Sequence, residues 1–341
     1  MTGGPLLTRR LLSSIALIGA ALPAVAQDAS DPLPSWRAGE AKEATSAFIR
    51  RTTERGSPDF VPEPERIATF DQDGTLWVEQ PMYSQVVYCL DRVPVLVRQR
   101  PELRNVEPFK TVLTGDPAAI GRLPKGELLK ILAATLTGMT TDQFQSEANK
   151  WLAAARHRRW GRPYTELIYQ PMLEVLAFFR SNGYKTYIVT GGGQDFVRLY
   201  AEKAYGIIPE QVVGTVGGTR YSLTKAGQPI LTKEPRLLLN DNDAGKPEGI
   251  HLMVGRRPRA AFGNSVGDQQ MLEYTTIDAA GSLGVLILHD DAEREYAYGP
   301  AKGLPDSRVG TFTQALYDDA KRRGWTVVSM KNDWARIFPF A

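Results

Sequence analysis

The sequence predicts an α/β fold in which a Rossmann-like parallel sheet is flanked by helices. Three apolar segments of strand character, residues 66–70, 185–189 and 259–262, each end in a polar loop, and helical periodicity follows each loop. Parallel sheets of this kind carry their functional sites at the carboxyl edge. We therefore expect the three loops to meet at one edge of the sheet.

Helices dominate the first part of the chain outside the first strand. A helix over residues 40–55 ends at Gly56, and the stretch between the first and second strands holds helical signals at residues 82–92, 125–136 and 141–158. Thr140 and Gln143 are spaced as a capping pair for the last of these. The sequence thus predicts a helical insertion over residues 80–163, between two parts of an α/β core at residues 27–79 and 164–341.

The core resumes with alternating helix and strand signals. Pro171 starts a helix that Asn182 and Gly183 stop, and Gly206 stops another. The expected elements are helices at 171–181, 194–205 and from about 269, a Gly-rich hairpin at 214–231, and strands at 283–288 and 325–329. This order of elements agrees with a parallel sheet.

The acidic loop, residues 71–75, places two carboxylates one residue apart. Asp71 and Asp73 follow the first strand directly, and Gly74 and Thr75 come next. Alternate residues of an extended segment point the same way, so the two side chains can converge, and Gly74 allows the chain to turn. Asp and Gly are also ordinary turn formers. We interpret the pair as a candidate site for a hard cation and for acid–base chemistry.

Two more loops carry polar groups at the ends of strands. The glycine loop, residues 190–193, has a hydroxyl at Thr190 followed by Gly191 and two further glycines. The Asn264 loop, residues 263–268, holds Asn264 and Asp268. Both fit a site at the carboxyl edge, and both also fit ordinary turns at the ends of strands.

In their order, these motifs resemble the haloacid dehalogenase superfamily, and within it phosphatases similar to phosphoserine phosphatase. The acidic loop matches the family's Asp-x-Asp-Gly-Thr motif, and Thr190 with Gly191 matches its second motif. Lys246 is the best candidate for the family's lysine, and residues 263–268 stand in place of its acidic last motif. The resemblance covers roughly residues 60–290 and implies that the helical insertion is a cap domain.

The resemblance also implies a role for each site residue. Asp71 would be the nucleophile that forms an aspartyl-phosphate, and Asp73 the general acid and base. Thr190 and the backbone N–H of Gly191 would bind the phosphoryl oxygens, and Lys246 would offset the negative charge. Mg²⁺ would be held by four side chains, those of Asp71, Asp73, Asn264 and Asp268. The substrate would be a small phosphorylated molecule, selected by the cap.

Two departures from the family pattern concern the metal. Asn264 stands where related enzymes carry an Asp, and Val266 stands where the secreted acid-phosphatase-like branch often carries another. An Asn carbonyl can bind Mg²⁺ but brings no charge, so we expect weaker metal affinity. A non-catalytic periplasmic protein or scaffold that holds a phosphorylated ligand is the alternative function. Dehalogenases fit less well, since they typically lack an acid at the position of Asp73.

The N-terminus predicts export. Arg9 and Arg10 precede an apolar run at residues 15–22, and small residues at 24–26 offer a cleavage site. The run is too short to span a membrane. We expect residues 1–26 to be a signal peptide and the mature chain to be periplasmic or secreted from a bacterium. The paired arginines leave open export by the twin-arginine machinery as well as by the general secretory route.

Composition excludes several classes of protein. The 341 residues are 43% hydrophobic and 23% charged, as in an ordinary globular chain. Loss of Arg9 and Arg10 with the signal lowers the 41 basic side chains to 39, against 38 acidic ones. This balance favours neither nucleic acid nor a membrane as partner. The single cysteine, Cys89, cannot form an intramolecular disulfide, and we expect it to be buried in a helix.

Two further groups have competing interpretations. The basic cluster at residues 156–159 could attract anionic substrates, but a solvated helix end is the favoured interpretation. Trp77, Glu79 and Tyr83 follow the acidic loop closely enough to border a pocket, although packing is their more common role.

Overall fold

The computed structural model describes residue 1, residues 31–277 and residues 280–340. Contacts group residues 32–341 into one compact unit. The predicted signal peptide, residues 1–26, lies outside the described residues except for residue 1. Among the described residues, no helix combines the length and apolar character needed to cross a membrane.

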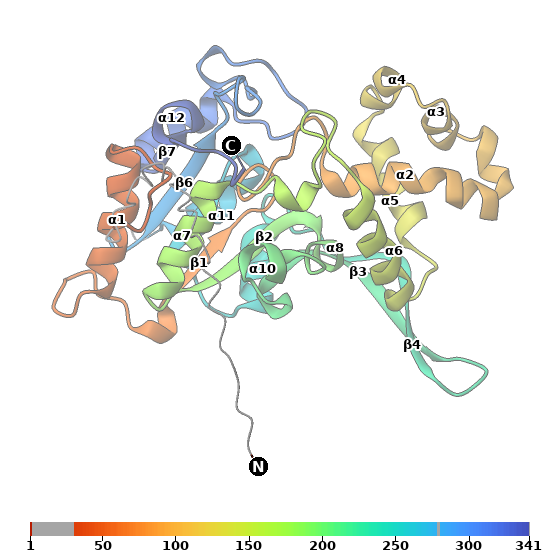
Figure 1. Ribbon diagram of the computed structural model, residues 1–341, viewed down its shortest axis with the longest axis horizontal. Helices are drawn as coiled ribbons and strands as arrows, with labels where there is room; N and C mark the ends of the chain where they lie inside the picture. Colours follow the sequence, from red (N-terminus) through yellow and green to blue (C-terminus); the bar gives the residue numbers. More distant parts are fainter. Residues whose placement is uncertain (2–30, 278–279, 341) are drawn as a thin grey trace. The chain divides into compact units, whose positions relative to one another are not determined.

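A seven-stranded sheet forms the centre of the compact unit, in the order β4-β3-β2-β1-β5-β6-β7 (Figure 1). Its strands are β1 (Ile67–Phe70), β2 (Lys185–Gly193), β3 (Val212–Leu223), β4 (Pro229–Leu239), β5 (Ala260–Gly263), β6 (Leu283–Leu288) and β7 (Thr326–Ser329). All neighbouring pairs are parallel except β3 and β4, which form the predicted antiparallel hairpin. The predicted α/β fold with a mostly parallel sheet is confirmed.

The longer helices cover both faces of the sheet or lie in the insertion. They are α1 (Glu40–Thr53), α2 (Ser84–Gln99), α5 (Lys125–Leu136), α6 (Thr141–Ala154), α7 (Gln170–Ser181), α10 (Gly245–Met253), α11 (Gln269–Thr275) and α12 (Gln314–Arg323). Shorter helices are α3 (Phe109–Leu113), α4 (Pro117–Gly121), α8 (Gln194–Val197), α9 (Ala201–Tyr205) and α13 (Met330–Asp333). The capping box of Thr140 and Gln143 is present at the start of α6.

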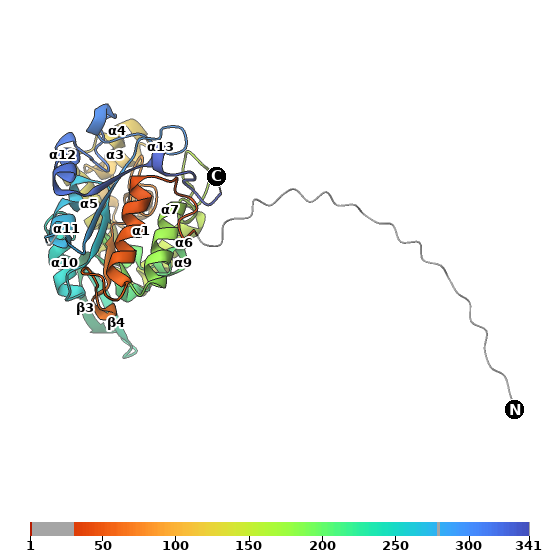
Figure 2. The same cartoon turned by 90° about the vertical axis from the view of Figure 1, so that its left-hand side faces the viewer.

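Side chains of the central strands point alternately to the two faces, because successive residues of a strand face opposite ways. Ile188 belongs to the hydrophobic cluster that includes Phe48 of α1 and Phe179 of α7. Its neighbour Val189 belongs to the cluster that includes residues of α10, α11 and α12. Figure 2 shows α1 and α7 on one side of the sheet and α10, α11 and α12 on the other. Helices on both faces explain why β1, β5 and β6 are buried throughout.

The order in which strands are added to the sheet reverses between β1 and β5: β2 and β3 are added on one side of β1, and β5, β6 and β7 on the other. From β1 the chain continues to β2 through helix α7 on one face, and from β5 it continues to β6 through α11 on the other face. The loops that follow β1 and β5 therefore lead to helices on opposite faces of the sheet. Such a switch point is where ligands bind in open α/β sheets.

Helices α2 to α6 occupy the chain between β1 and β2 and form the predicted insertion, here called the cap region (residues 80–163). Contacts join α2 to α5, and both α5 and α6 to β4. Figure 1 shows α5 and α6 beside the hairpin of β3 and β4. The division of the chain into separate cap and core domains stays a prediction.

Several predicted boundaries differ from the observed ones. The helix expected to end at Arg92 continues through Pro94 to Gln99, where Val93, Leu96 and Val97 are buried. The helix expected over residues 194–205 is divided into α8 and α9, and the helix expected to reach residue 158 ends at Ala154. Cys89 is buried in α2, as predicted. Tertiary packing overrides local propensity at these places.

Candidate active site at the carboxyl edge of the sheet

The acidic loop, the glycine loop and the Asn264 loop lie next to one another because their strands do. Phe70 is in register with Ile188 of β2 on one side and with Phe262 of β5 on the other. The backbone N–H of Asp71 donates to the carbonyl of Phe262 across 2.9 Å, so the first aspartate leaves the sheet beside β5. The structure therefore brings together the strand ends that the sequence predicted to meet.

Lys246, in the first turn of α10, forms the centre of the site. Its Nζ donates to Oδ1 of Asp71 across 2.6 Å and to the carbonyl of Val189 across 2.8 Å. The same atom lies 2.7 Å from Oδ1 of Asp268. Burial opposes the charge of this lysine, but the carboxylates of Asp268 and Asp71 outweigh burial and raise its pKa. The group is therefore a fixed, buried ammonium ion.

Asp71 and Asp73 have raised pKa values. Burial, followed by the charge of Asp268, raises the pKa of Asp71 to about 8, while Lys246 opposes this shift. Burial raises the pKa of Asp73 to about 6, and the hydrogen bond from Trp77 opposes it. Trp77 Nε1 donates to Oδ1 of Asp73 across 2.7 Å, so this tryptophan both packs and contacts the site. A carboxyl with a pKa near 6 can exchange protons near neutral pH.

Gly74 allows the acidic loop to turn, as predicted. Its φ of 76° lies in the left-handed region. A Cβ at this position would come within 2.1 Å of Asn264 Nδ2 and 2.3 Å of Glu79 Oε1. The loop therefore packs too closely on both side chains for any residue except glycine.

The glycine loop lies within β2 and not beyond it, since the strand extends to Gly193. Pairing with β3 shifts register between Thr190 and Gly193, which marks a bulge. Thr190 Oγ1 accepts from the N–H of Gly192 across 3.0 Å. A Cβ on Gly192 would lie 3.3 Å from Thr190 Oγ1 and 3.7 Å from Asp73 Oδ2, so the loop runs beside Asp73.

Asp268 faces Lys246 and its own loop. Oδ1 is the atom next to Lys246, and Oδ2 accepts from the N–H groups of Asn264 and Ser265, each across 3.0 Å. These contacts position the ammonium of Lys246 and fix the shape of the Asn264 loop. A direct bond from Asp268 to a metal stays a prediction.

Sequence reasoning assigned Glu79 mainly to packing and missed four other residues near the loops, of which two come from the last part of the chain. Glu79 Oε1 accepts from Asn264 Nδ2 across 2.6 Å and from Tyr298 OH across 2.8 Å. Burial raises the pKa of Glu79 well above its usual range. His289 Nε2 lies 2.8 Å from the carbonyl of Gly74. No local signal marks His289, which contacts the acidic loop, or Tyr298, which contacts Glu79, because both lie more than 200 positions further along the chain.

Gln85 and Asn242 also border the glycine loop. Gln85, in the first turn of α2, accepts from the N–H of Gly193 across 2.6 Å, so the cap region contacts this loop directly. Asn242 Oδ1 would lie 3.0 Å from a Cβ on Gly191 and 2.8 Å from one on Gly267. Neither residue is marked by a motif in the sequence.

The donor set suits a divalent cation. Among the described residues, no group of three or more His, Cys, Asp and Glu side chains has the geometry of a metal site. The candidate set contains two carboxylates, Asp71 and Asp73, together with the amide oxygen of Asn264, and hard cations accept such oxygen ligands. Lys246 is already shared by Asp71 and Asp268, so an additional cation would offset the remaining charge of the acidic loop. The oxygen donors present are therefore of the kind that Mg²⁺ accepts, and a metal bound here stays a prediction.

The basic cluster at residues 156–159 lies beyond the end of α6. His157 is buried, and its Nε2 lies 2.8 Å from the carbonyl of Gln80 while its Nδ1 accepts from the N–H of Arg159. Arg159 donates to the carbonyls of Ala292 and Glu293. The favoured interpretation, a solvated helix end, is thus wrong for His157, which is buried, whereas the three arginines of the cluster are exposed.

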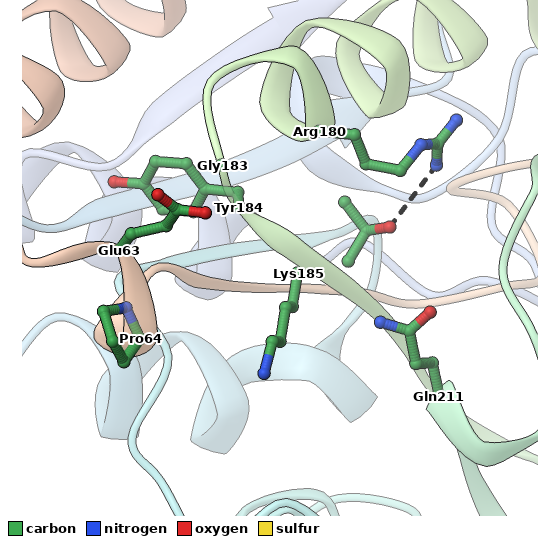
Figure 3. Close-up of a pocket in the computed structure, with 8 residues that line it drawn as sticks. Glu63, Pro64, Arg180, Gly183, Tyr184, Lys185 and Gln211 are labelled. Atoms are coloured by element: carbon green, nitrogen blue, oxygen red, sulfur yellow. Dashed lines mark hydrogen bonds between the residues drawn. The ribbon is translucent and has the colours of Figure 1, made fainter.

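A surface pocket of about 550 Å³ lies at the opposite edge of the sheet (Figure 3). Lys185, which begins β2, and Arg180 of α7 line it, and Arg180 donates to the hydroxyl of Thr186 across 3.4 Å. Because Lys185 begins β2 and Thr190 follows towards its carboxyl end, this pocket is separate from the candidate site.

The sheet order and the polar loops at its switch point define a doubly wound α/β protein with a site at the carboxyl edge. The family model for haloacid dehalogenase-like hydrolases matches residues 68–273, which is more than half of the chain and includes all three loops and Lys246. The chain belongs to the haloacid dehalogenase-like hydrolase family, as the sequence motifs predicted.

Several solved structures resemble this chain. A protein of unknown function from Bordetella pertussis is 16% identical, with 77% of this chain and 98% of that chain covered and a TM-score of 0.48. A functionally unknown protein from Anaerococcus prevotii is 14% identical, with 84% and 90% covered and a TM-score of 0.49. A phosphoserine phosphohydrolase-like protein from Francisella tularensis is 16% identical, with 66% and 88% covered and a TM-score of 0.37. No curated protein matches the chain.

Proposed function

We propose that this hydrolase is a Mg²⁺-dependent phosphatase that acts on small phosphate monoesters through an aspartyl-phosphate. The observation that carries the proposal is the contact of Lys246 with Asp71 at 2.6 Å, beside Asp73 and the hydroxyl of Thr190. Phosphoryl transfer needs a nucleophile, positive charge and hydrogen-bond donors for the phosphoryl oxygens. These groups supply all three.

The chemistry proceeds in two steps. Asp71 attacks phosphorus as the bond from phosphorus to the leaving oxygen breaks, and Asp73 gives that oxygen its proton. Water then attacks the phosphorus of the aspartyl-phosphate, Asp73 takes the proton of the water, and phosphate leaves with Asp71 restored. A pKa of about 6 for Asp73 suits a group that both gives and takes a proton.

The remaining residues bind and orient the substrate. Thr190 and the backbone N–H of Gly191 would donate to phosphoryl oxygens, and Lys246 would offset the charge that develops on them. Asp71, Asp73 and Asn264 would hold Mg²⁺, with Asp268 as the fourth ligand that the family resemblance implies. When bound, the cation supplies positive charge that favours ionised carboxylates and a phosphate dianion in the same small volume.

Assay of the purified mature chain with p-nitrophenyl phosphate tests the proposal. We expect phosphate release that requires Mg²⁺ and ends when EDTA is added in excess. Full activity in EDTA after extensive dialysis would contradict the metal assignment. The second candidate is a periplasmic protein that binds a phosphorylated ligand without turnover, which Asn264 and Val266 favour; phosphate binding by calorimetry without hydrolysis would support it.

The location and partners of the chain are also proposals. A mature protein that begins after residue 26 and is found in the periplasm or medium would support the signal peptide in residues 1–26. Replacement of Arg9 and Arg10 by Lys would block export by the twin-arginine machinery and leave the general secretory route open. A panel of phosphate esters would identify the small phosphorylated substrate.

A further inference from the structure

Asn264 is paired with a buried acid that no motif of the family resemblance includes. Its Nδ2 lies 2.6 Å from Oε1 of Glu79, and the two residues are 1% and 2% exposed. The pair lies directly against Gly74, since a Cβ there would come within 2.3 Å of both of the bonded atoms. The contact is therefore beneath the acidic loop, next to the two aspartates.

The contact fixes which end of the Asn264 amide faces which way. An amide group donates from its nitrogen and accepts at its oxygen, whereas a carboxylate only accepts. Glu79 Oε1 receives two donors, Asn264 Nδ2 and Tyr298 OH. Among the described residues, the hydroxyl of Thr75, at 3.3 Å, is the hydrogen-bond donor to Asn264 Oδ1. The amide oxygen therefore keeps a lone pair for another partner.

We infer that Glu79 is a positioning residue that orients the Asn264 amide so that its oxygen serves the divalent cation held with Asp71 and Asp73. The inference rests on the proposed metal site. It also explains why position 264 carries an amide. An Asp there would face Glu79 at hydrogen-bond distance, and two adjacent buried acids cannot both ionise, so at least one would have to hold a proton at a cost in stability. The carboxyl group missing from the Asn264 loop is present one contact away, at position 79.

The first test measures Mg²⁺ binding by isothermal titration calorimetry, which needs no turnover. Glu79→Met removes the acceptor at similar length, and we expect it to weaken Mg²⁺ binding by about 10-fold, within the usual range for contacting residues. Glu79→Gln is the matched control, because it keeps an acceptor for Asn264, and it should bind within about threefold of wild type. Equal Mg²⁺ affinity of Glu79→Met and wild type would overturn the inference.

The same substitution in the Asn264→Asp variant distinguishes a loss of amide orientation from general damage to the site. In Asn264→Asp both terminal atoms of the side chain are oxygens, so either one can face the cation and the side chain needs no partner to orient it. Adding Glu79→Met to Asn264→Asp should therefore cause no loss of Mg²⁺ affinity. The same 10-fold loss in both backgrounds would show that Glu79 acts on the whole site and not through Asn264, which contradicts the inference.

A stability measurement uses two conservative variants that keep the volume of the side chains. In EDTA, Asn264→Asp should lower the melting temperature because the new carboxylate faces Glu79. The double variant Glu79→Gln with Asn264→Asp exchanges acid and amide, and should restore the melting temperature to near the wild-type value. Equal melting temperatures of the single and double variants would overturn the inference.

The outcomes also separate this inference from the proposed function. Wild-type protein that binds no Mg²⁺ would overturn the metal assignment and the inference with it. Mg²⁺ binding and hydrolysis by wild type, together with undiminished binding by Glu79→Met, would overturn the inference alone.

Discussion

Lys246 donates a 2.6 Å hydrogen bond to Oδ1 of Asp71, although 175 positions separate the two residues in the sequence. The same ammonium lies between Asp71 and Asp268, and all three side chains are almost completely buried. One buried cation thus balances two buried carboxylates. Removing the ammonium of Lys246 would leave two carboxylates without a compensating charge in a place that water does not reach.

Lys246→Met should therefore affect both stability and activity. We expect a loss of about 3 to 5 kcal/mol in the free energy of unfolding, as for other buried ion pairs that lose one partner. Phosphate release should fall by at least about 100-fold, the scale of lost electrostatic stabilisation. Urea unfolding and a phosphate assay measure the two effects. Lys185→Met, in the exposed part of β2, is the control and should change neither.

Asp71→Asn should abolish hydrolysis while the fold remains intact. The amide keeps the shape of the side chain but cannot form an acyl phosphate, so acid-quenched protein should carry no covalent phosphate by mass spectrometry. Asp243→Asn, in the loop that precedes α10, is a control that should keep wild-type turnover. Wild-type kcat in Asp71→Asn would refute the assignment of the nucleophile.

Asp73 predicts a pH dependence. Its pKa of about 6 means that the acid form is lost as pH rises through this value. For an alkyl phosphate, whose leaving oxygen needs a proton, kcat/KM should decline above about pH 6, with the midpoint moved down by a bound cation. Asp73→Asn should remove this decline and slow the reaction by about 100-fold or more. Asp73→Asn should slow the hydrolysis of a p-nitrophenyl ester less, because this leaving group departs without a proton.

Trp77 should set the position of that decline. Its Nε1 hydrogen bond stabilises the ionised form of Asp73 and so lowers the pKa. Trp77→Phe removes the donor, and the decline of kcat/KM should move to higher pH. Trp151→Phe loses a comparable hydrogen bond, to Asp91 in the cap region, and should leave the profile in place. An unmoved profile in Trp77→Phe would mean that Asp73 is not the group that titrates.

Asp241 gives a prediction about stability. The residue is fully buried, and burial raises its pKa from 3.8 to about 7, against the opposing charge of Lys246. A raised carboxyl pKa means that the folded protein binds the proton more tightly than the unfolded chain. The contribution of Asp241 to the free energy of unfolding is therefore fully present below about pH 4, and it is lost as pH rises to about 7.

Asp241→Asn cannot ionise, so it should gain stability relative to wild type as pH rises. We expect little difference near pH 4 and an advantage of about 4 kcal/mol at pH 8, since the shift spans about three pKa units and each corresponds to about 1.4 kcal/mol. Urea unfolding at several pH values in EDTA measures this. A constant difference across the pH range would contradict the raised pKa.

The sequence by itself determined the parts of this protein that depend on local pattern. The strand at residues 283–288 and the helix at residues 125–136 have the observed bounds, because apolar periodicity and flanking signals specify such elements. The meeting of Asp71, Thr190 and Asn264 also followed from sequence, since parallel strands must bring their carboxyl ends to one edge. Membership of the hydrolase family followed from the order of the same motifs.

Tertiary structure decided what depends on contacts between distant segments. Pro94 lies inside α2 because buried neighbours outweigh the cost of a proline in a helix. Asp268 faces Lys246. Glu79 accepts a hydrogen bond from Asn264, from which 185 positions of sequence separate it. A local pattern records which residues are present but not which buried donor meets which acceptor. Burial makes each such pairing costly to leave unmade, and so the packed fold, not the motif, sets the final arrangement of the site.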